Sequence, residues 1–577
     1  MSRSRKVRRP ARAAPAERTV RPAPGSGMAA RVALPVGVIL LLGLLAYSSS
    51  LQGEFVFDDI EQLVLNPTIR DLGAFLGPAG YRAQPHRYMA YLSFALNHRL
   101  GGYEPIGWHV VNLAIHLANA LLVWQLVRLA FRSPRLRGSA LASSADAIAF
   151  ASGALFVAHP LATQAVSYVV QRITSLATLF YLLAVVLYLA WRLRPPGRGR
   201  IFLYAGVLAC SLLAFRTKEI AFTLPVAIAL VEWAFLEGGA RRWLPVLPVA
   251  ALALVIPLTL VDLGRPTGDL LASADTGTRV QTVTSRADYL RTEAVVVVRY
   301  LGLLVVPVGQ VLDHDVAIRT SWLAPDVAAS TLLLLALAAL ATWLAWRSRP
   351  GGTRPPLDPA VRLVALGIAW FFVALSVESS VIPIADVMNE HRMYLPSAGL
   401  LPAAATAAAL LFLRVAPLHV ARDTALAGAI AGAVLGVVTW NRNLVWQTEI
   451  SLWNDVAEKS PRHWRALKNL STNYFKKGRI PEAIAALRKH VEIFPDEPVS
   501  HMQLGVGLYV ARQPIEAEME LRKAVDLGPN EPDMLFNLAF FLIEMGRRPE
   551  ARPYLERLIP LEKDPERRKW AEGELAR

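Results

Sequence analysis

Long uncharged apolar runs recur along this chain, and they constrain its fold more than any other feature. The first, VALPVGVILLLGLLAYSS at 32–49, contains no charged residue. A helix needs roughly 17–25 apolar residues to span a bilayer, and a charge inside such a span is costly. Only 18% of the residues are charged, against about 25% in a typical soluble protein. The sequence therefore predicts an all-α, polytopic membrane protein.

About eleven of these runs are expected to cross the membrane. They lie at 32–49, 108–127, 147–158, 173–191, 201–215, 220–231, 243–261, 327–346, 363–377, 393–413 and 424–441. The short runs at 147–158 and 220–231 can cross if they are tilted and packed against protein. A further apolar segment at 292–309 carries Glu293 and Arg299. We expect that segment to be a re-entrant or interfacial helix.

Arginines gather after every second run and predict how the spans are oriented. They lie on the same side as the N-terminal segment 1–28, whose first 27 residues hold eight Lys or Arg against one Glu. Loops rich in Lys and Arg stay in the cytoplasm, so we expect this disordered basic tail to lie inside. Loop 50–107 and the C-terminal region are then outside. Because the net charge of +16 fits this orientation signal, no nucleic-acid partner is expected.

A 34-residue period marks the C-terminal region. It is carried by Pro461, Pro495 and Pro529, by Leu470, Leu504 and Leu538, and by Ala483, Ala517 and Ala551. Small residues at a fixed helix crossing and a proline at the end of each unit are typical of tetratricopeptide repeats. We predict a connector at 446–461, three repeats over 462–563 and a cap at 564–577. Such arrays bind peptides or proteins, although a purely structural array is the alternative.

Under this orientation, ionisable and polar residues gather at the outer ends of the spans. They are Asp58, Asp59, Arg87, His109, Asn112, His116, His159, Arg172, Lys218, Glu219, Asp313, His314, Asp315, Glu390, His391, Arg392 and Tyr394. Ionisable groups near the membrane are costly and are usually functional. Their convergence from distant positions on one face predicts a catalytic cavity that opens at the outer leaflet.

Each of these residues also has a structural interpretation. Asp58 and Asp59 are either a solvated loop start, a general base with a raised pKa, or ligands of a divalent cation. Lys218 and Glu219 could be an interfacial ion pair at a helix end, and the histidines could bond between helices. No cofactor is certain, and metal dependence stays open, including at 313–315. The single cysteine, Cys210, excludes a cysteine zinc site.

Several motifs resemble one known family. FVFDDIEQLVLNPTI, GWHVVNLAIHLANALLV, HPLATQAVSYVVQRITSLATLFYLLAVVLYL, KEIAFTLPVAIALVEW and NEHRMYLPSAGL occur in order before the repeats. Together they resemble the transmembrane-and-tetratricopeptide-repeat-containing family, which is related to the protein O-mannosyltransferases of the GT-C glycosyltransferase superfamily. The resemblance implies a GT-C-like domain over 29–445 in a multi-pass protein of a bacterial inner membrane, with periplasmic repeats. One departure is Tyr88, which stands after Arg87 where family members often have proline.

The resemblance also implies an activity and roles for residues. The family transfers a sugar, expected to be mannose-like, from a polyprenyl-phosphate donor to a hydroxyl acceptor, here expected to be protein Ser or Thr. Its catalytic acidic residue falls on Asp58 or Asp59, while Arg392 and Tyr394 fall near the donor phosphate. Lys218 and Arg172 are further candidates for that phosphate. The alternative is a non-catalytic membrane scaffold whose repeats recruit envelope proteins.

Overall fold

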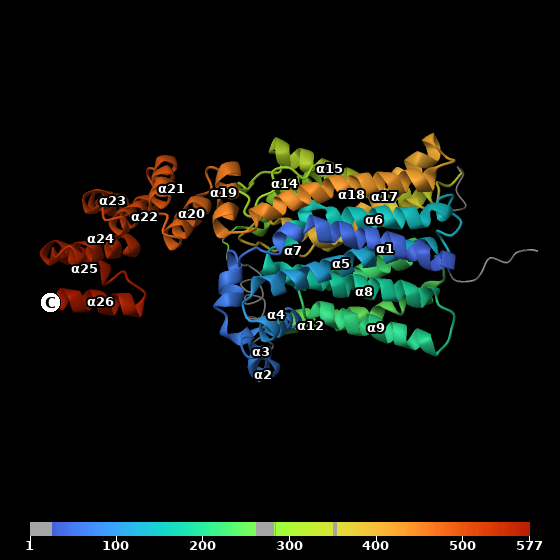
Figure 1. Ribbon diagram of the computed structural model, residues 1–577, viewed down its shortest axis with the longest axis horizontal. Helices are drawn as coiled ribbons and strands as arrows, with labels where there is room; N and C mark the ends of the chain where they lie inside the picture. The colour runs from blue at the N-terminus through green and yellow to red at the C-terminus, as the bar shows by residue number, and fades with distance from the viewer. Residues whose placement is uncertain (1–25, 261–281, 283, 350–354) are drawn as a thin grey trace, which may run out of the picture.

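The computed structural model describes residues 26–260, 282, 284–349 and 355–577. These residues form a bundle of long helices with a curved helical array at one end (Figure 1). The described residues confirm the prediction of an all-α fold with a helical-repeat region. Of the predicted basic tail, residues 1–25 lie outside the described residues; residues 261–281, 283 and 350–354 lie outside them too.

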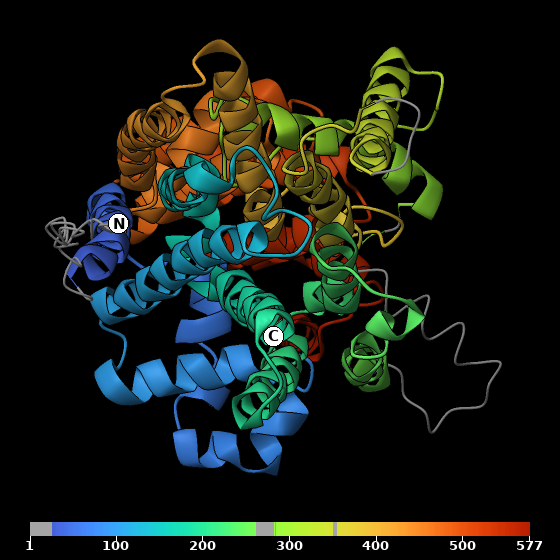
Figure 2. The ribbon, with the colours of Figure 1, turned by 90° about the vertical axis from the view of Figure 1, so that its right-hand side faces the viewer.

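The bundle contains helices that run between the array end and the opposite end. They are α1 (Ser26–Ala46), α5 (Pro105–Phe131), α6 (Ala145–Ala158), α8 (Arg172–Leu193), α9 (Arg198–Phe215), α10 (Leu224–Phe235), α11 (Val246–Ala253), α12 (Val255–Leu260), α15 (Pro325–Arg347), α16 (Val361–Leu375), α17 (Tyr394–Val415) and α18 (Val420–Val445). Viewed from the end opposite the array, α15 stands at the edge of the bundle (Figure 2).

Seven helices of the described chain are long and apolar enough to cross a membrane. An eighth is counted if the bent pair Ala142–Ala158 and Pro160–Val166 forms one span. The sequence predicted about eleven spans because it also counted three shorter helices, namely α1, whose apolar part is Val32–Ala46, together with α10 and α16. These three helices run within the same bundle, so the difference concerns length and not arrangement.

Glycines allow α18 to pack closely against α6 and α1. A Cβ atom at Gly428 would lie only 2.5 Å from the Cβ of Ala151 on α6. One at Gly432 would lie 3.1 Å from the Leu42 side chain on α1. Lipid tails are as apolar as leucine, so helices in a membrane associate through such close backbone packing. The small residues spaced by four along α18 therefore fix the helix against its neighbours.

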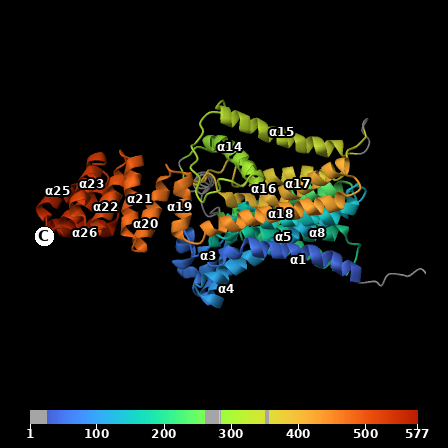
Figure 3. The same ribbon diagram turned by 45° about the horizontal axis from the view of Figure 1, so that its top comes forward.

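Helix α14 (Arg286–Val305) stays at the array end of the bundle. Near its start, Tyr289 Oη donates to the backbone oxygen of Glu378 at 2.9 Å. Near its end, Tyr300 Oη donates to the backbone oxygen of Asn389 at 2.9 Å. Both acceptors lie in the same segment between α16 and α17, and α14 lies beside the start of α15 (Figure 3). This arrangement agrees with an interfacial helix at 292–309 and not with a further span.

Paired helices of nearly constant length form the repeat array. They are α20 (Trp464–Lys476), α21 (Ile480–Ile493), α22 (Pro498–Val510), α23 (Pro514–Leu527), α24 (Pro532–Glu544) and α25 (Arg548–Leu558), followed by α26 (Pro565–Ala576). The first helices of the pairs begin 34 residues apart, as the sequence period predicts. Ala483, Ala517 and Ala551 are fully buried at the crossings, where a larger side chain would separate the helices.

The first repeat shares a hydrophobic core with loop 50–107, which we call the first outer loop after the side predicted for it. That loop carries α2 (Leu72–Leu76), α3 (Pro78–Ala83) and α4 (Tyr88–Gly101). Val56 and Phe75 of the loop belong to one buried cluster with Leu467 and Leu470 of α20. Helix α19 (Glu449–Lys459) contributes to the same cluster. The boundary predicted at 461/462 therefore does not coincide with a break in packing.

Candidate active site

Asp59 ties the first outer loop to the bundle. Its side chain is fully buried, and its Oδ2 accepts from the N–H of Val56 at 3.1 Å. Its Oδ1 accepts from the N–H of Val170, just before α8, at 2.7 Å. Burial raises the pKa of Asp59 to about 8, against the effect of these two N–H donors. Asp59 therefore positions its neighbour and has no exposed oxygen to offer a substrate.

Asp58 is half-buried in the same turn. Its N–H donates to Tyr168 Oη at 3.0 Å, and the preceding residue, Phe57, has a φ of +51°. A left-handed non-glycine residue is uncommon and costly, and such strain clusters at functional sites. Burial raises the pKa of Asp58; a hydrogen bond from Tyr168 opposes this, and the charges of Asp386 and Glu61 add to it. Asp58 thus combines partial exposure with a shifted proton affinity.

Two ion pairs join the segment before α10 to the first outer loop and to the segment between α16 and α17. Arg87 forms a fork with Glu219, with Nε–Oε1 and Nη2–Oε2 distances of 3.1 and 3.3 Å. Burial alone would raise the pKa of Glu219, but the Arg87 guanidinium outweighs burial and lowers it. Lys218 Nζ lies 2.7 Å from Glu378 Oε1 and donates to Thr174 Oγ1 of α8 at 3.0 Å. Both cations are thereby held in fixed positions.

Arg392 is held by the segment that precedes it and by α14. Nη1 donates to the backbone oxygen of Val387 at 2.7 Å and lies 3.5 Å from Glu293 Oε1. Nη2 donates to the backbone oxygen of Asp386 at 2.7 Å. The Asp386 side chain in turn accepts from Arg465 of the first repeat at 3.1 Å. Asp386 therefore connects the array to Arg392.

Electrostatic interactions join these groups into one cluster. The charges of Lys218, Arg392 and Arg87 all act on His391, whose N–H donates to Gln164 Oε1 at 2.6 Å. Tyr91 interacts with both Arg87 and Asp58. We call this set the outer polar cluster: Asp58, Arg87, Tyr91, Lys218, Glu219, Glu293, Glu378, His391 and Arg392. It assembles residues that lie more than 300 positions apart in the sequence.

Arg172 lies inside the protein, engaged in hydrogen bonds. It is fully buried and donates to Asn112 Oδ1 at 2.6 Å and to Asn97 Oδ1 at 2.7 Å. Nη2 also donates to the backbone oxygen of Trp108 at 3.0 Å, and Nη1 to that of Ser93 at 3.3 Å. These contacts join α4, α5 and α8, so Arg172 and Asn112 act as structural links and we omit them from the proposed donor site.

Tyr394 and three of the histidines also have buried hydrogen-bond partners. Tyr394 Oη lies 2.7 Å from His116 Nδ1 and 3.2 Å from Asn119 Nδ2, on the buried face of α17. His109 Nε2 lies 3.1 Å from the backbone oxygen of Gly53. His159 Nε2 lies 2.9 Å from that of Leu304, while its Nδ1 accepts from the N–H of Leu161. None of these contacts brings the residue into the outer polar cluster.

Glu390 and the 313–315 segment hold each other and the array. Glu390 Oε1 accepts from the N–H of Val311 at 2.7 Å and lies 3.0 Å from His314 Nε2. Asp313 Oδ2 accepts from Arg465 at 2.8 Å. In the part of the chain that the structure describes, no group of three or more His, Cys, Asp or Glu is arranged to hold a metal ion. The described residues therefore offer no such site for the divalent cation that the sequence analysis left open.

Sequence reasoning missed several members of the cluster. Glu378 and Tyr91 lie outside the motifs, and nothing in their spacing points to their partners. The same holds for Arg465, which is not a member of the cluster but bonds to Asp386 beside it. Glu293 did stand out, as a carboxylate in an apolar segment. Its partner was not evident, because α14 meets Arg392 only through folding.

An apolar groove leads to the cluster from the side of the bundle. It has a volume of about 420 Å³ and lies between α14, α15 and α16. Leu334 and Leu335 of α15 and Phe372 of α16 form its walls, and Glu293 lines it beside Arg392. The groove is therefore apolar along its walls and ends beside the Glu293–Arg392 pair.

Known proteins similar to this chain carry transferase names. A Drosophila melanogaster protein named "Protein O-mannosyl-transferase Tmtc3" is 24% identical over 590 residues, which cover 89% of this chain and 62% of the fly protein. The human protein O-mannosyl-transferase TMTC1 is 34% identical over 171 residues, which are 27% of this chain and 18% of the relative. These relatives confirm the family resemblance. This chain spans less than two thirds of the fly protein's length.

Solved structures and family models were compared as well. ArnT from Cupriavidus metallidurans, solved with undecaprenyl phosphate, aligns with a TM-score of 0.38 and 13% identity over 76% of this chain and 81% of its own. No family model matches the chain.

Proposed function

We propose that this chain, a relative of the protein O-mannosyl-transferases, is a membrane glycosyltransferase that moves a sugar from a polyprenyl-phosphate donor to a protein hydroxyl. The observation that carries the proposal is the outer polar cluster, in which the half-buried carboxylate of Asp58 and three cations gather near an apolar groove. The named relatives support the same reaction class. A mannose-like sugar is the donor group that their names favour.

The donor binds with its lipid in the groove between α14, α15 and α16 and its phosphate at Arg392. Guanidinium groups match phosphate oxygens through paired N–H donors. Among the described residues, no hydrogen bond engages Nε of Arg392 or Nη1 of Arg87, so each retains a donor. Lys218 uses two of its three hydrogens on Glu378 and Thr174. Negative charge that develops on the departing phosphate is stabilised by such fixed cations in a site that excludes water.

Asp58 accepts the proton of the acceptor hydroxyl. As the hydroxyl oxygen attacks the anomeric carbon, the bond from that carbon to the phosphate oxygen breaks and the lipid phosphate departs. This single displacement inverts the anomeric centre and needs no second carboxylate. A raised pKa suits a general base, because proton transfer is most efficient when the pKa lies near the working pH. Asp59 holds the turn in which Asp58 sits.

The repeats offer the acceptor polypeptide to this end of the bundle. Arg465 connects the first repeat with Asp313 and Asp386, beside Asp58. With the arginine-rich end in the cytoplasm, the reaction takes place at the outer face of a bacterial inner membrane, with the repeats in the periplasm.

The test measures sugar transfer in membranes supplied with labelled polyprenyl-phosphate mannose and a Ser/Thr-containing acceptor protein. Asp58→Asn should lower turnover by about 10²–10⁴-fold, the usual contribution of a general base, while donor binding persists. Arg392→Ala should instead weaken donor binding. Asp315→Asn is the matched control, because Asp315 is an exposed carboxylate at the same end of the bundle.

Full transfer by both Asp58→Asn and Arg392→Ala at normal expression would exclude this site. If all variants still recruit partner proteins and no sugar transfer is found in the wild type, the scaffold interpretation holds instead. Asp59→Asn should mainly lower the yield of folded protein, because an amide can accept only one of the two N–H bonds described above.

A further inference from the structure

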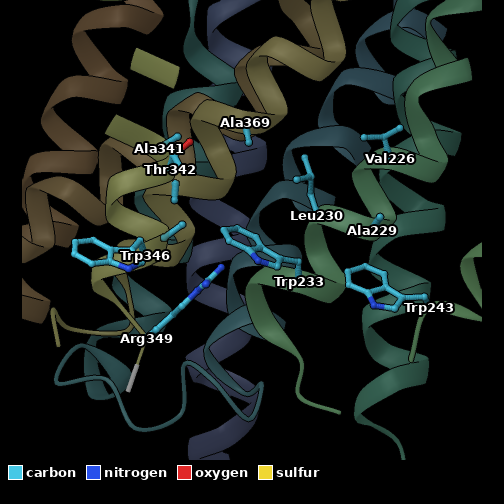
Figure 4. Close-up of a pocket in the computed structure, with 12 residues that line it drawn as sticks. Val226, Ala229, Leu230, Trp233, Trp243, Ala341, Thr342, Trp346, Arg349 and Ala369 are labelled. Atoms are coloured by element: carbon cyan, nitrogen blue, oxygen red, sulfur yellow. The ribbon is translucent and has the colours of Figure 1, made fainter. Parts of the chain in front are cut away.

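A second groove lies at the end of the bundle opposite the repeats. It has a volume of about 630 Å³ and is bounded by α10, α15 and α16. Trp233, Trp243 and Trp346 line it, and Arg349 reaches into it between Trp346 and Trp233 (Figure 4). The remaining walls are alanine, valine and leucine with one threonine, Thr342. The groove is therefore apolar along the helices and basic at its mouth.

Several arginines make the surroundings of Arg349 strongly positive. Arg362 interacts electrostatically with Arg135 and Arg349, and Arg135 also with Arg242. Arg362 is only 4% exposed, and its Nη1 finds no hydrogen-bond partner among the described residues. A buried cation without compensation is costly.

The carboxylates at this end do little to compensate that charge. Asp146 and Glu232 are engaged by Arg128 and Arg192. Asp358 accepts from Ser139 Oγ and the N–H of Ala140. Glu237 does act on Arg135 and Arg362, but it is exposed to solvent and forms no close ion pair with them in the described part of the chain.

We propose that this groove binds an anionic phospholipid from the leaflet at the arginine-rich end. Its phosphate lies at Arg349, and an acyl chain runs along the apolar wall between α10, α15 and α16. Basic pockets between membrane helices bind anionic headgroups, and tryptophans sit at headgroup level. The site is separate from the outer polar cluster and independent of the proposed transferase reaction.

The openness of the groove favours a lipid over a soluble anion. Val226 and Trp346 on its walls are 50% and 60% exposed, and α15 stands at the edge of the bundle. An acyl chain would cover this apolar wall, whereas an inorganic ion would leave it bare. A zwitterionic lipid has no net charge to offset the arginines, so the charge of the site favours an anionic headgroup.

The test is native mass spectrometry of the delipidated full-length chain titrated with phosphatidylglycerol. Phosphatidylcholine with the same acyl chains and inorganic phosphate serve as comparison probes. Arg349→Gln should weaken phosphatidylglycerol binding about fivefold, the effect of one arginine at a charged membrane surface. Arg414→Gln removes an exposed arginine from the last turn of α17, at the same end but outside this groove, and should leave binding unchanged.

A second variant tests the apolar wall without changing any charge. Thr342→Trp fills the groove and should also weaken phosphatidylglycerol binding, and it carries the test if Arg349→Gln fails to fold. Equal losses for Arg349→Gln and Arg414→Gln would mean only diffuse attraction and would overturn the proposal. So would equal binding of phosphatidylcholine, Arg349-dependent binding of inorganic phosphate of similar strength, or no effect of Thr342→Trp.

Discussion

At the scale of residues, two adjacent carboxylates illustrate how environment separates chemically identical groups. Asp59 has both oxygens bonded to backbone N–H groups and no exposed surface, whereas Asp58 in the same turn is half-buried. The sequence predicted the pair but could not rank its members, because the N–H donor from Val170 is 111 residues away. The difference in burial is why we propose Asp58 as the base.

Opposite charges next to Asp58 predict opposite changes in pH dependence. Asp58 must be ionised to act as base, so kcat/KM should fall as the pH drops through its pKa, which burial raises above the ordinary value of 3.8. Arg465 lowers this pKa and Asp386 raises it. Arg465→Gln should therefore move the acidic limb to higher pH, and Asp386→Asn should move it to lower pH. Shifts in the same direction would mean that both variants merely disturb docking of the array.

Arg172 should prove structural and not part of donor binding. Replacing it by methionine leaves buried oxygens of Asn97, Asn112 and Trp108 without their donor, which costs about 2–5 kcal/mol of stability. Thermal unfolding in detergent should show this loss, while the exposed Arg99→Met serves as a near-neutral control. Unchanged unfolding with weakened donor binding would return Arg172 to the donor site.

At the scale of elements, α14 shows where hydropathy alone is insufficient. Its apolar run resembles a span, but Glu293 pairs with Arg392, and Tyr289 and Tyr300 bond to one outer segment. Long uniform runs such as α8 and α18 were predictable, because a span of that length has few alternatives. Whether a mixed run crosses depends on contacts with distant residues, which periodicity does not reveal.

Cysteine labelling can test the placement of α14. Cys210 is the chain's one cysteine and is buried, so a background for single reporters is simple to make. Ala287→Cys and Val308→Cys, before and after most of the helix, should both react with an impermeant maleimide applied from the array side. Leu418→Cys, 89% exposed in the turn between α17 and α18, should react only from the opposite side. Reaction of Val308→Cys from that opposite side would mean that α14 spans the membrane.

At the scale of the whole molecule, the array and the bundle are continuous. Period and hydropathy predicted both parts, since each pattern is local. Their joint core was not predictable, because Val56 and Leu470 come together only when the first outer loop folds against α20. The proposed base therefore sits in a loop whose packing depends on the first repeat.

Two deletions of equal length can separate the role of the first repeat, which packs against the first outer loop, from the role of the array's length. Removing 498–531 joins equivalent positions of the period and retains α20, so transfer to a small hydroxyl acceptor should persist while transfer to a protein acceptor changes. Removing 464–497 puts Val499 in the place of Arg465 and Ala511 in that of Lys477, which pairs with Glu54 at 3.0 Å. Transfer to both acceptors should then fall at least about tenfold, because a displaced base loses orientation. Equal effects of the two deletions would contradict a special role for the first repeat.

An array anchored by its first repeat can change length freely at its far end. Each repeat contacts mainly its neighbours, and α26 closes the stack beyond α25. Gain or loss of whole units between the first repeat and this cap would alter how far the array extends from the membrane. It would not alter the first repeat, which packs against the first outer loop. Under the proposed function, the number of units would set how far from the membrane an acceptor protein is held, with no change in the residues at the bundle.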